Sequence, residues 1–442
     1  MTVQHGMRAW TRRHVMAAAS VVALAIAAGG APALAQEEKP FAGTKLTFWG
    51  GLIFSEAANK LLVEAVEAWG EANGVETDVV MINQNEMVQK LSAAVESKTL
   101  PDAVDLSLEL LLVLSRQGVF VPLDDVYEAV GKAQGGWYEA VDKASDTSAV
   151  ASGRTGLPFG VTGNLLLRRT DLLGAAGFDK APATWDELVA QSAAVTEAPV
   201  SGLGLALSNV GDGNVQVSVM QSFGGRIADD TGKKVTIKSD ATRAYLTWLK
   251  NAWDKGVFPP GNATWDGAGD NQAYLSGQAA FIANTGSVGL AAKSQDPELY
   301  ETTGYSPLPA GPVGTISPIM LQMRAIPAAS KNQAAAKALL AHLSEPAFTS
   351  AYYASAIYGP VLQAEAKLPA FDGSDPIHAG LLDLVKNGSA PGYPDVYNAA
   401  FADAFSNFII PKMAQRVVID GWDFDKAMDE AQTQAQAIYD KY

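Results

Sequence analysis

The side chains in this chain that could do chemistry are aromatic rings and amides rather than the usual catalytic groups. The sequence has nine tryptophans and thirteen tyrosines but no cysteine, and its only histidines are His5, His14, His342 and His378. A thiol nucleophile is therefore excluded, and a zinc site or a Ser-His-Asp triad has few ligands to draw on. Aromatic faces combined with neutral hydrogen-bonding groups favour a polar, uncharged ligand.

Motifs for nucleotide or metal binding are incomplete. The glycine pairs at 202–204 and 211–213 lack the third glycine of a dinucleotide-binding loop. The acidic run at 420–425 lacks the spacing of a calcium loop. Tyr352-Tyr353 resembles the paired tyrosines of ferric-ion binding proteins, but adjacent residues of a helix point in different directions, which favours a packing role. The sequence therefore predicts neither a metal site nor a cofactor.

The start of the chain has the pattern of a cleaved export signal covering residues 1–35. Three arginines precede an apolar run at 15–28, and an Ala-x-Ala sequence at 33–35 predicts cleavage before Gln36. The apolar run is too short for a membrane span, which needs about 20 residues. Residues 11–16 partly match the twin-arginine motif, so the twin-arginine and secretory routes both stay open. Either route predicts a protein freed into the periplasm.

The charge of the chain argues against polyanionic partners. The net charge is −15, and loss of residues 1–35, which carry three arginines and no acid, takes it to −18. Nucleic acid and anionic membrane surfaces are poor partners for so acidic a protein. Self-repulsion favours a monomer. The roughly 400 residues that remain exceed one hydrophobic core and predict two or more lobes.

Alternating strand and helix patterns follow the signal. Strand patterns occur at 45–49, 75–82 and 101–106, and amphipathic helix patterns at 55–72 and 85–97. This order indicates a doubly wound α/β fold that begins with a parallel sheet.

Later in the chain, extended segments are predicted at 156–161 and 164–168. Capping boxes are predicted at Thr184–Glu187 and Ser330–Gln333, and a last helix at 424–439.

Several ordered segments carry a more specific pattern. They include Pro101-Asp102 after a helix, the Gly-Val-Phe-Val-Pro-Leu-Asp stretch at 118–124, Thr-Trp-Asp-Glu-Leu at 184–188 and Gly-Gln-Ala-Ala at 277–280. These segments occur in order along nearly the whole chain after the signal. Together they resemble the extracellular solute-binding proteins of carbohydrate ABC importers, the family that includes maltose-binding protein. The other matching segments lie at 45–50, 91–97, 156–164, 326–332 and 359–361.

The resemblance implies a type II periplasmic binding protein fold, with two α/β lobes and a ligand cleft between them. The chain would cross the hinge near 160–164, 283–287 and 340–346. The N-terminal lobe would comprise 41–160 plus 287–340, and the C-terminal lobe 165–283 plus 345–442.

The implied function is the capture of a sugar, oligosaccharide or polyol, which a membrane permease and its ATPase then import. Such a protein is a receptor and not an enzyme. Two alternatives stay open: a receptor of the same fold for ferric ion or another non-sugar solute, and a carbohydrate-active enzyme using Glu109 and Asp266 as its two carboxylates. The family's Tyr-Asn is replaced by Arg168-Arg169, and a frequent aromatic residue is replaced by Ser287, which favours a small sugar or polyol.

The candidate ligand contacts combine rings that can stack on the apolar face of a sugar with polar groups that can bond its hydroxyls. Glu109 aligns with an acidic residue that contacts sugar in the resembling family, and a carboxylate is a strong acceptor for hydroxyl protons. Trp265, in the glycine-rich loop 261–269, is the best stacking candidate. The full set is Trp49, Asn83, Gln84, Glu109, Thr162, Asn164, Trp265, Asp266, Asn284, Gly286, Ser287, Gln322 and Tyr358.

Overall fold

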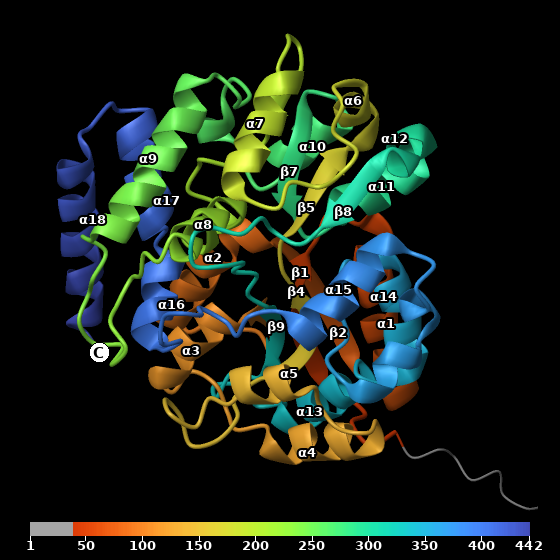
Figure 1. The fold of residues 1–442 in the computed structure, drawn as a ribbon. Helices are drawn as coiled ribbons and strands as arrows, with labels where there is room; N and C mark the ends of the chain where they lie inside the picture. The colour runs from red at the N-terminus through yellow and green to blue at the C-terminus, as the bar shows by residue number, and fades with distance from the viewer. Residues whose placement is uncertain (1–38) are drawn as a thin grey trace, which may run out of the picture. The chain divides into compact units, whose positions relative to one another are not determined.

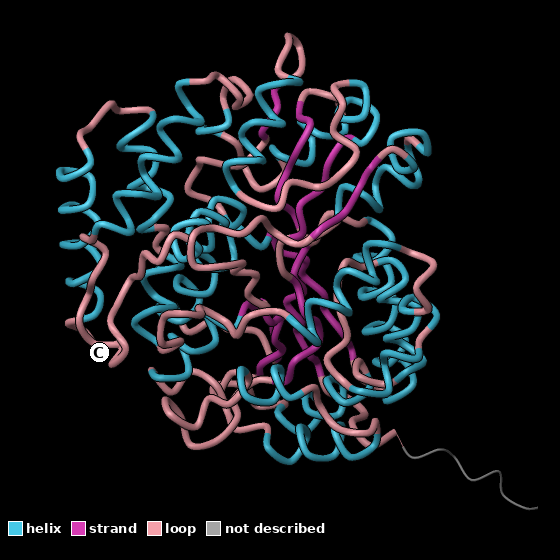
Figure 2. Tube along the Cα trace, in the orientation of Figure 1, coloured by secondary structure: helices cyan, strands magenta, loops and turns pink. Residues whose placement is uncertain are grey.

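The computed structural model describes residues 39–442, so the predicted export signal lies outside the described residues. Strands form two separate sheets, and helices pack around each of them (Figures 1 and 2). Within residues 39–442, no helix has both the length and the apolar character required to cross a membrane.

The first sheet has five strands in the order β2-β1-β3-β9-β4. Strand β1 runs parallel to β2 and β3, which confirms the predicted parallel opening. Strand β9 comes from much later in the chain and pairs antiparallel with both β3 and β4. The bounds are β1 (Lys45–Leu52), β2 (Glu76–Asn83), β3 (Ala103–Ser107), β4 (Leu157–Thr162) and β9 (Met320–Ala325).

The second sheet has four strands in the order β6-β7-β5-β8. Strand β5 follows β4 after only Gly163 and Asn164, so one short segment joins the two sheets. Strand β7 pairs antiparallel with β5 and parallel with β6. The bounds are β5 (Leu165–Arg169), β6 (Ser201–Leu203), β7 (Ala279–Asn284) and β8 (Thr303–Ser306).

Some helices pack near the first sheet and the others near the second. Figure 1 shows α9, α17 and α18 as one layer beside the second sheet. Near the first sheet lie α1 (Glu56–Asn73), α2 (Gln84–Ser97), α3 (Leu108–Arg116), α4 (Asp124–Ala133), α5 (Glu139–Ala144), α13 (Gln333–His342), α14 (Pro346–Ser355) and α15 (Pro376–Asn387). The others are α6 (Thr170–Ala175), α7 (Trp185–Val195), α8 (Val215–Ser222), α9 (Asp240–Asp254), α10 (Gly269–Leu275), α11 (Ser287–Gln295), α12 (Pro297–Glu301), α16 (Ala399–Ser406), α17 (Ile409–Val418) and α18 (Phe424–Tyr439).

Local sequence explains where α1 begins and ends. The Ser55 side chain caps the helix by accepting a hydrogen bond from the Ala58 amide at 3.3 Å. Leu62 and Val66 are buried on one face, against the first sheet. Gly74 ends the helix with φ of 74°, a left-handed conformation that favours glycine.

The two predicted capping boxes have different outcomes. At α7, Thr184 accepts from the Glu187 amide at 3.2 Å, but the Glu187 carboxylate accepts from the Ala183 amide and not from that of Thr184. At α13 the prediction is wrong. The Ser330 hydroxyl donates to Asp102 at 2.6 Å, and the α13 N-cap has no side-chain bond. The Ser330 oxygen also accepts from the Asn332 amide at 3.0 Å, one residue before the amide that the predicted box requires.

Packing also bears on the predicted lobe boundaries. The junction of β4 and β5 coincides with the crossing expected at 160–164. Strand β8 pairs with β5, however, and α14 contributes Tyr352 and Tyr353 to the core of the first sheet. These contacts group β8 with the second sheet and α14 with the first sheet, whereas the expected lobe limits at 287 and 345 would group each with the other sheet. We propose that the second and third crossings lie instead at 307–319 and 388–398.

Candidate functional site

The first group of candidate contacts lies where β1 and β2 end. These strands are parallel, and the register pairs Leu52 with Asn83, so their carboxyl ends meet at one edge. Gln84 is exposed and lies over Gly51, where an added Cβ would stand 3.4 Å from the Gln84 amide nitrogen. Trp49 is half-buried and packs against the hydrophobic core of the first sheet. An aromatic ring and an exposed amide therefore share this edge.

Three further candidates lie deeper in the first sheet. Gln322 is half-buried on β9, opposite Ser107 of β3. Thr162 is buried at the end of β4, where its hydroxyl contacts a β9 carbonyl. Tyr358 is 2% exposed and packs edge-on against Phe159, with ring centroids 5.5 Å apart. Burial raises the pKa of Tyr358, and the nearby Asp105 charge raises it further.

Glu109 lies in the first turn of α3 and is nearly buried. Its Oε1 accepts a hydrogen bond of 2.7 Å from the Tyr397 hydroxyl. The N-terminal end of a helix favours a carboxylate, because the first backbone amides and the helix dipole face it. A distant tyrosine therefore holds one oxygen of this carboxylate at a defined position.

The second sheet holds a buried hydrogen-bond network at the start of the β7–α11 turn. The Asn284 amide donates to Asp270 at 2.8 Å and to Asn271 at 2.9 Å. The Ser287 hydroxyl donates to the side-chain oxygen Oδ1 of Asn284 at 2.9 Å. Gly286 has φ of 98°, and an added Cβ would stand 2.4 Å from Ile377. In this conformation Asn284 and Ser287 fix the turn. The half-buried Asn164 directly precedes β5, whose first residue, Leu165, pairs with Asn284.

Trp265 and Asp266 lie next to this network. The Trp265 ring is half-buried and packs on Gly269, where an added Cβ would stand only 2.3 Å from the ring. Asp266 is exposed and accepts from the Ala268 amide at 3.0 Å. Burial raises the pKa of Asp212 well above its usual value, and the charges of Asp270 and Asp266 add to this effect. The Trp265 ring therefore lies in a loop beside a cluster of three acidic residues, Asp266, Asp270 and Asp212.

Tyr397, Asp212, Asp270 and Asn271 are polar residues of these groups that the sequence analysis missed. Asp270 and Asn271 follow the glycine-rich loop directly, and this position could have suggested them. Tyr397 lies 288 residues from Glu109 and carries no local signal of that contact.

The features behind the two alternative functions have other partners. Tyr352 and Tyr353 are both buried, and the Tyr353 hydroxyl donates to the Phe159 carbonyl at 3.0 Å. This agrees with the packing role expected for them. Glu109 is engaged by Tyr397, and Asp266 by its own turn. Among the described residues, no three His, Cys, Asp or Glu side chains are grouped so as to hold a metal ion.

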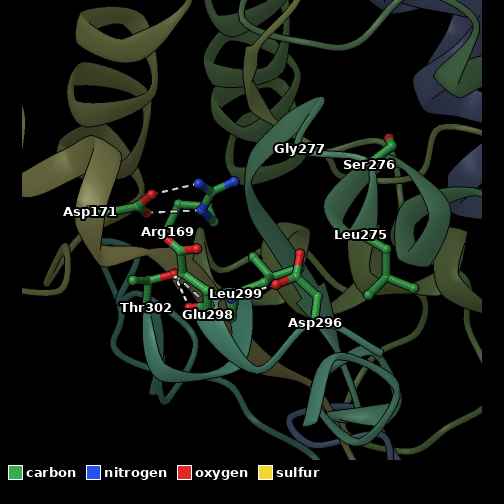
Figure 3. Close-up of a pocket in the computed structure, with 9 residues that line it drawn as sticks. All are labelled: Arg169, Asp171, Leu275, Ser276, Gly277, Asp296, Glu298, Leu299 and Thr302. Carbon is green, nitrogen blue, oxygen red and sulfur yellow. Dashed lines mark hydrogen bonds and ion pairs between the residues drawn. The ribbon is translucent and has the colours of Figure 1, made fainter. Parts of the chain in front are cut away.

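A hollow of about 220 Å³ lies elsewhere, between β5, the end of α10 and α12. Figure 3 shows Arg169 facing Asp171 across one side of it, with Leu275 on another. The Arg169 Nε donates to Asp171 at 2.9 Å, so the cation is neutralised locally. None of the candidate contacts lines this hollow.

Asp270 predicts a pH dependence of stability. Burial raises its pKa to about 6. A carboxyl group with a raised pKa stabilises the fold most when protonated, below about pH 4, and this contribution is lost as the pH rises through 6. The free energy of unfolding of the wild type should therefore fall between pH 4 and pH 6. We expect this fall to be smaller by about 1–3 kcal/mol in Asp270→Asn. Urea unfolding at both pH values measures this change.

The matched control is Asp179→Asn, which removes an exposed acid from another loop; Asp266 is unsuitable because its own charge acts on the pKa of Asp270. Asp179→Asn should keep the wild-type difference between the two pH values. An unchanged difference in Asp270→Asn would contradict the prediction.

The sequence matches the family model described as bacterial extracellular solute-binding protein over residues 55–349. It is also 24% identical over 381 residues to a Brucella abortus (strain 2308) protein named as a binding protein. That match covers 84% of this chain and 87% of the relative.

Solved structures give the same fold over almost the full described chain. An ABC transporter solute-binding protein from Agrobacterium radiobacter K84, in complex with ribitol, has a TM-score of 0.79 at 18% identity, covering 90% of this chain and 99% of that one. The maltose-bound MalE3 of T. maritima has a TM-score of 0.78 at 20% identity, covering 89% and 100%. The predicted two-lobe type II fold is confirmed. Because the family model covers most of the chain, this protein belongs to the bacterial extracellular solute-binding protein family.

Proposed function

We propose that the protein is the substrate-binding component of an ABC importer and that it captures a sugar, oligosaccharide or polyol. The family match over residues 55–349 is the observation that carries this proposal. The fold likeness to binding proteins solved with maltose and with ribitol supports a carbohydrate or polyol ligand. The protein would act in the periplasm as a monomer and deliver its ligand to a membrane permease powered by an ATPase.

The chemistry of the candidate contacts fits such a ligand. Trp49 and Trp265 offer half-buried rings for the apolar face of a sugar. Gln84 and Asp266 are exposed, and Glu109 offers a carboxylate, so hydroxyl groups find both donors and acceptors. We assign stacking to Trp265 and hydroxyl binding to Glu109. This role requires binding and release without bond cleavage, which makes the protein a receptor and not an enzyme.

Charge in the proposed site favours neutral ligands. The candidate contacts include Glu109 and Asp266 but no lysine, arginine or histidine. We expect a uronic acid to bind at least about tenfold more weakly than the neutral sugar of the same ring, because its carboxylate meets like charges without a cation. Isothermal titration calorimetry with the two sugars, at one ionic strength, measures the ratio. Equal affinities would contradict this expectation.

A thermal-shift screen of residues 36–442 tests the function itself. The panel comprises monosaccharides, disaccharides, polyols and ferric citrate, each with and without chelator. A ligand that binds only the folded state raises the melting temperature by mass action. We expect a shift with one carbohydrate or polyol class that chelator does not change. A shift with ferric citrate alone would overturn the proposal, and so would release of product from a bound sugar.

A further inference from the structure

A short segment at 391–398, here called the strap, is fastened to the elements around the second sheet. Asp395 is buried and accepts hydrogen bonds from the Ala228 amide at 2.8 Å and from Gln221 of α8 at 2.9 Å. Asn398 caps α16 by accepting from the Phe401 amide at 2.8 Å. These bonds fix the backbone on both sides of Tyr397.

From the strap, Tyr397 reaches the first sheet's side of the molecule. Its ring packs against the cores of both sheets, with its centroid 5.5 Å from that of Phe401. Its hydroxyl donates to Glu109 Oε1 at 2.7 Å, on α3, the helix that α16 packs against. Burial raises the pKa of Tyr397 far above its usual value, and the Glu109 charge adds to this. The hydroxyl therefore keeps its proton and acts as a donor.

The bond from Tyr397 engages only one of the two oxygens of the Glu109 carboxylate. Oε1 is engaged by Tyr397, while within residues 39–442 Oε2 accepts no hydrogen bond. A carboxylate fixed through one oxygen presents the other in a single direction, so a ligand does not have to restrict its rotation on binding. A tyrosine in a segment that crosses between the lobes, and that is bonded to elements of the second sheet, thereby orients an acceptor beside the first sheet.

We propose that Tyr397 is a positioning residue that holds the Glu109 carboxylate in place for a solute hydroxyl, acting from the strap across the two lobes. The inference rests on the proposed function, because it takes Glu109 to contact the carbohydrate. It adds a residue that would act through Glu109.

The variant Tyr397→Phe removes only the hydroxyl and keeps the ring between the two cores. We expect its Kd for the carbohydrate found in the screen to rise about tenfold. Tyr393→Phe is the matched control, because Tyr393 lies on the same strap, is 53% exposed and should keep the wild-type Kd. Circular dichroism of both variants verifies that they fold.

A double-variant cycle separates positioning from a general structural role. If Tyr397 acts through Glu109, adding Tyr397→Phe to Glu109→Ala should leave Kd within twofold of that of Glu109→Ala alone. A further tenfold loss in that background would overturn the inference, as would a wild-type Kd in Tyr397→Phe. Failure of the wild-type protein to bind any carbohydrate would overturn the proposed function as well, so the two failures are distinguishable.

Discussion

Replacing Arg324 by methionine is expected to lower the free energy of unfolding by about 3–5 kcal/mol. Arg324 is fully buried on β9, and its Nε donates to Asp105 on β3 at 3.1 Å. The guanidinium also lies 4.1 Å from the centre of the Phe159 ring and donates to the Leu343 carbonyl at 3.2 Å. Methionine fills a similar volume but leaves the Asp105 carboxylate buried without its cation.

Removing one partner of the buried pair is expected to lower stability strongly. Replacing both partners by apolar residues is expected to change stability little. Burial raises the pKa of Asp105 although Arg324 acts to lower it, so the attraction does not fully offset desolvation. We therefore expect the double variant Asp105→Leu with Arg324→Met to recover most of the loss, to within about 1–2 kcal/mol of wild type. Chemical denaturation of the wild type and both variants at pH 7 measures this. A loss below about 1 kcal/mol in Arg324→Met would contradict the prediction.

Replacing Trp265 by alanine is expected to weaken carbohydrate binding about 30- to 100-fold. Losing a stacked indole removes roughly 100 Å² of apolar contact, which corresponds to about 2–3 kcal/mol of binding free energy. The ring is held ready, because it packs directly on the Gly269 backbone at the start of α10. The loss should therefore fall mainly on the dissociation rate. Calorimetry and stopped-flow fluorescence with the identified ligand measure both quantities.

Trp422→Ala provides the matched control for this measurement. Trp422 is also half-buried, but it lies between Arg416 and Lys426, with their charged groups 4.6 Å and 3.6 Å from its ring centre. Its removal should leave Kd unchanged. If Trp265→Ala weakened binding by less than about threefold, the stacking role assigned to Trp265 would be wrong.

The local elements could be predicted because their causes lie within a few residues. The Ser55 cap, the buried face of α1 and the left-handed Gly74 are set by neighbours in the chain. The strand pattern of β1, followed by the helix pattern of α1 and then by a second strand, predicts that the first sheet begins with parallel strands. The last helix was predicted with its observed limits, Phe424–Tyr439. Order along the chain was also sufficient to indicate the family.

Only the tertiary structure decided which distant residues meet. β9 enters the first sheet between β3 and β4 and pairs Arg324 with Asp105, 219 residues away. The strap brings Tyr397 to Glu109, and the β7–α11 turn encloses Asn284 with Asp270. A buried carboxylate must find a partner, but any cation or hydroxyl satisfies that requirement, so sequence alone does not name it. The sequence therefore determined the elements and their order, whereas the chain crossings between the sheets decided the partners of the polar residues.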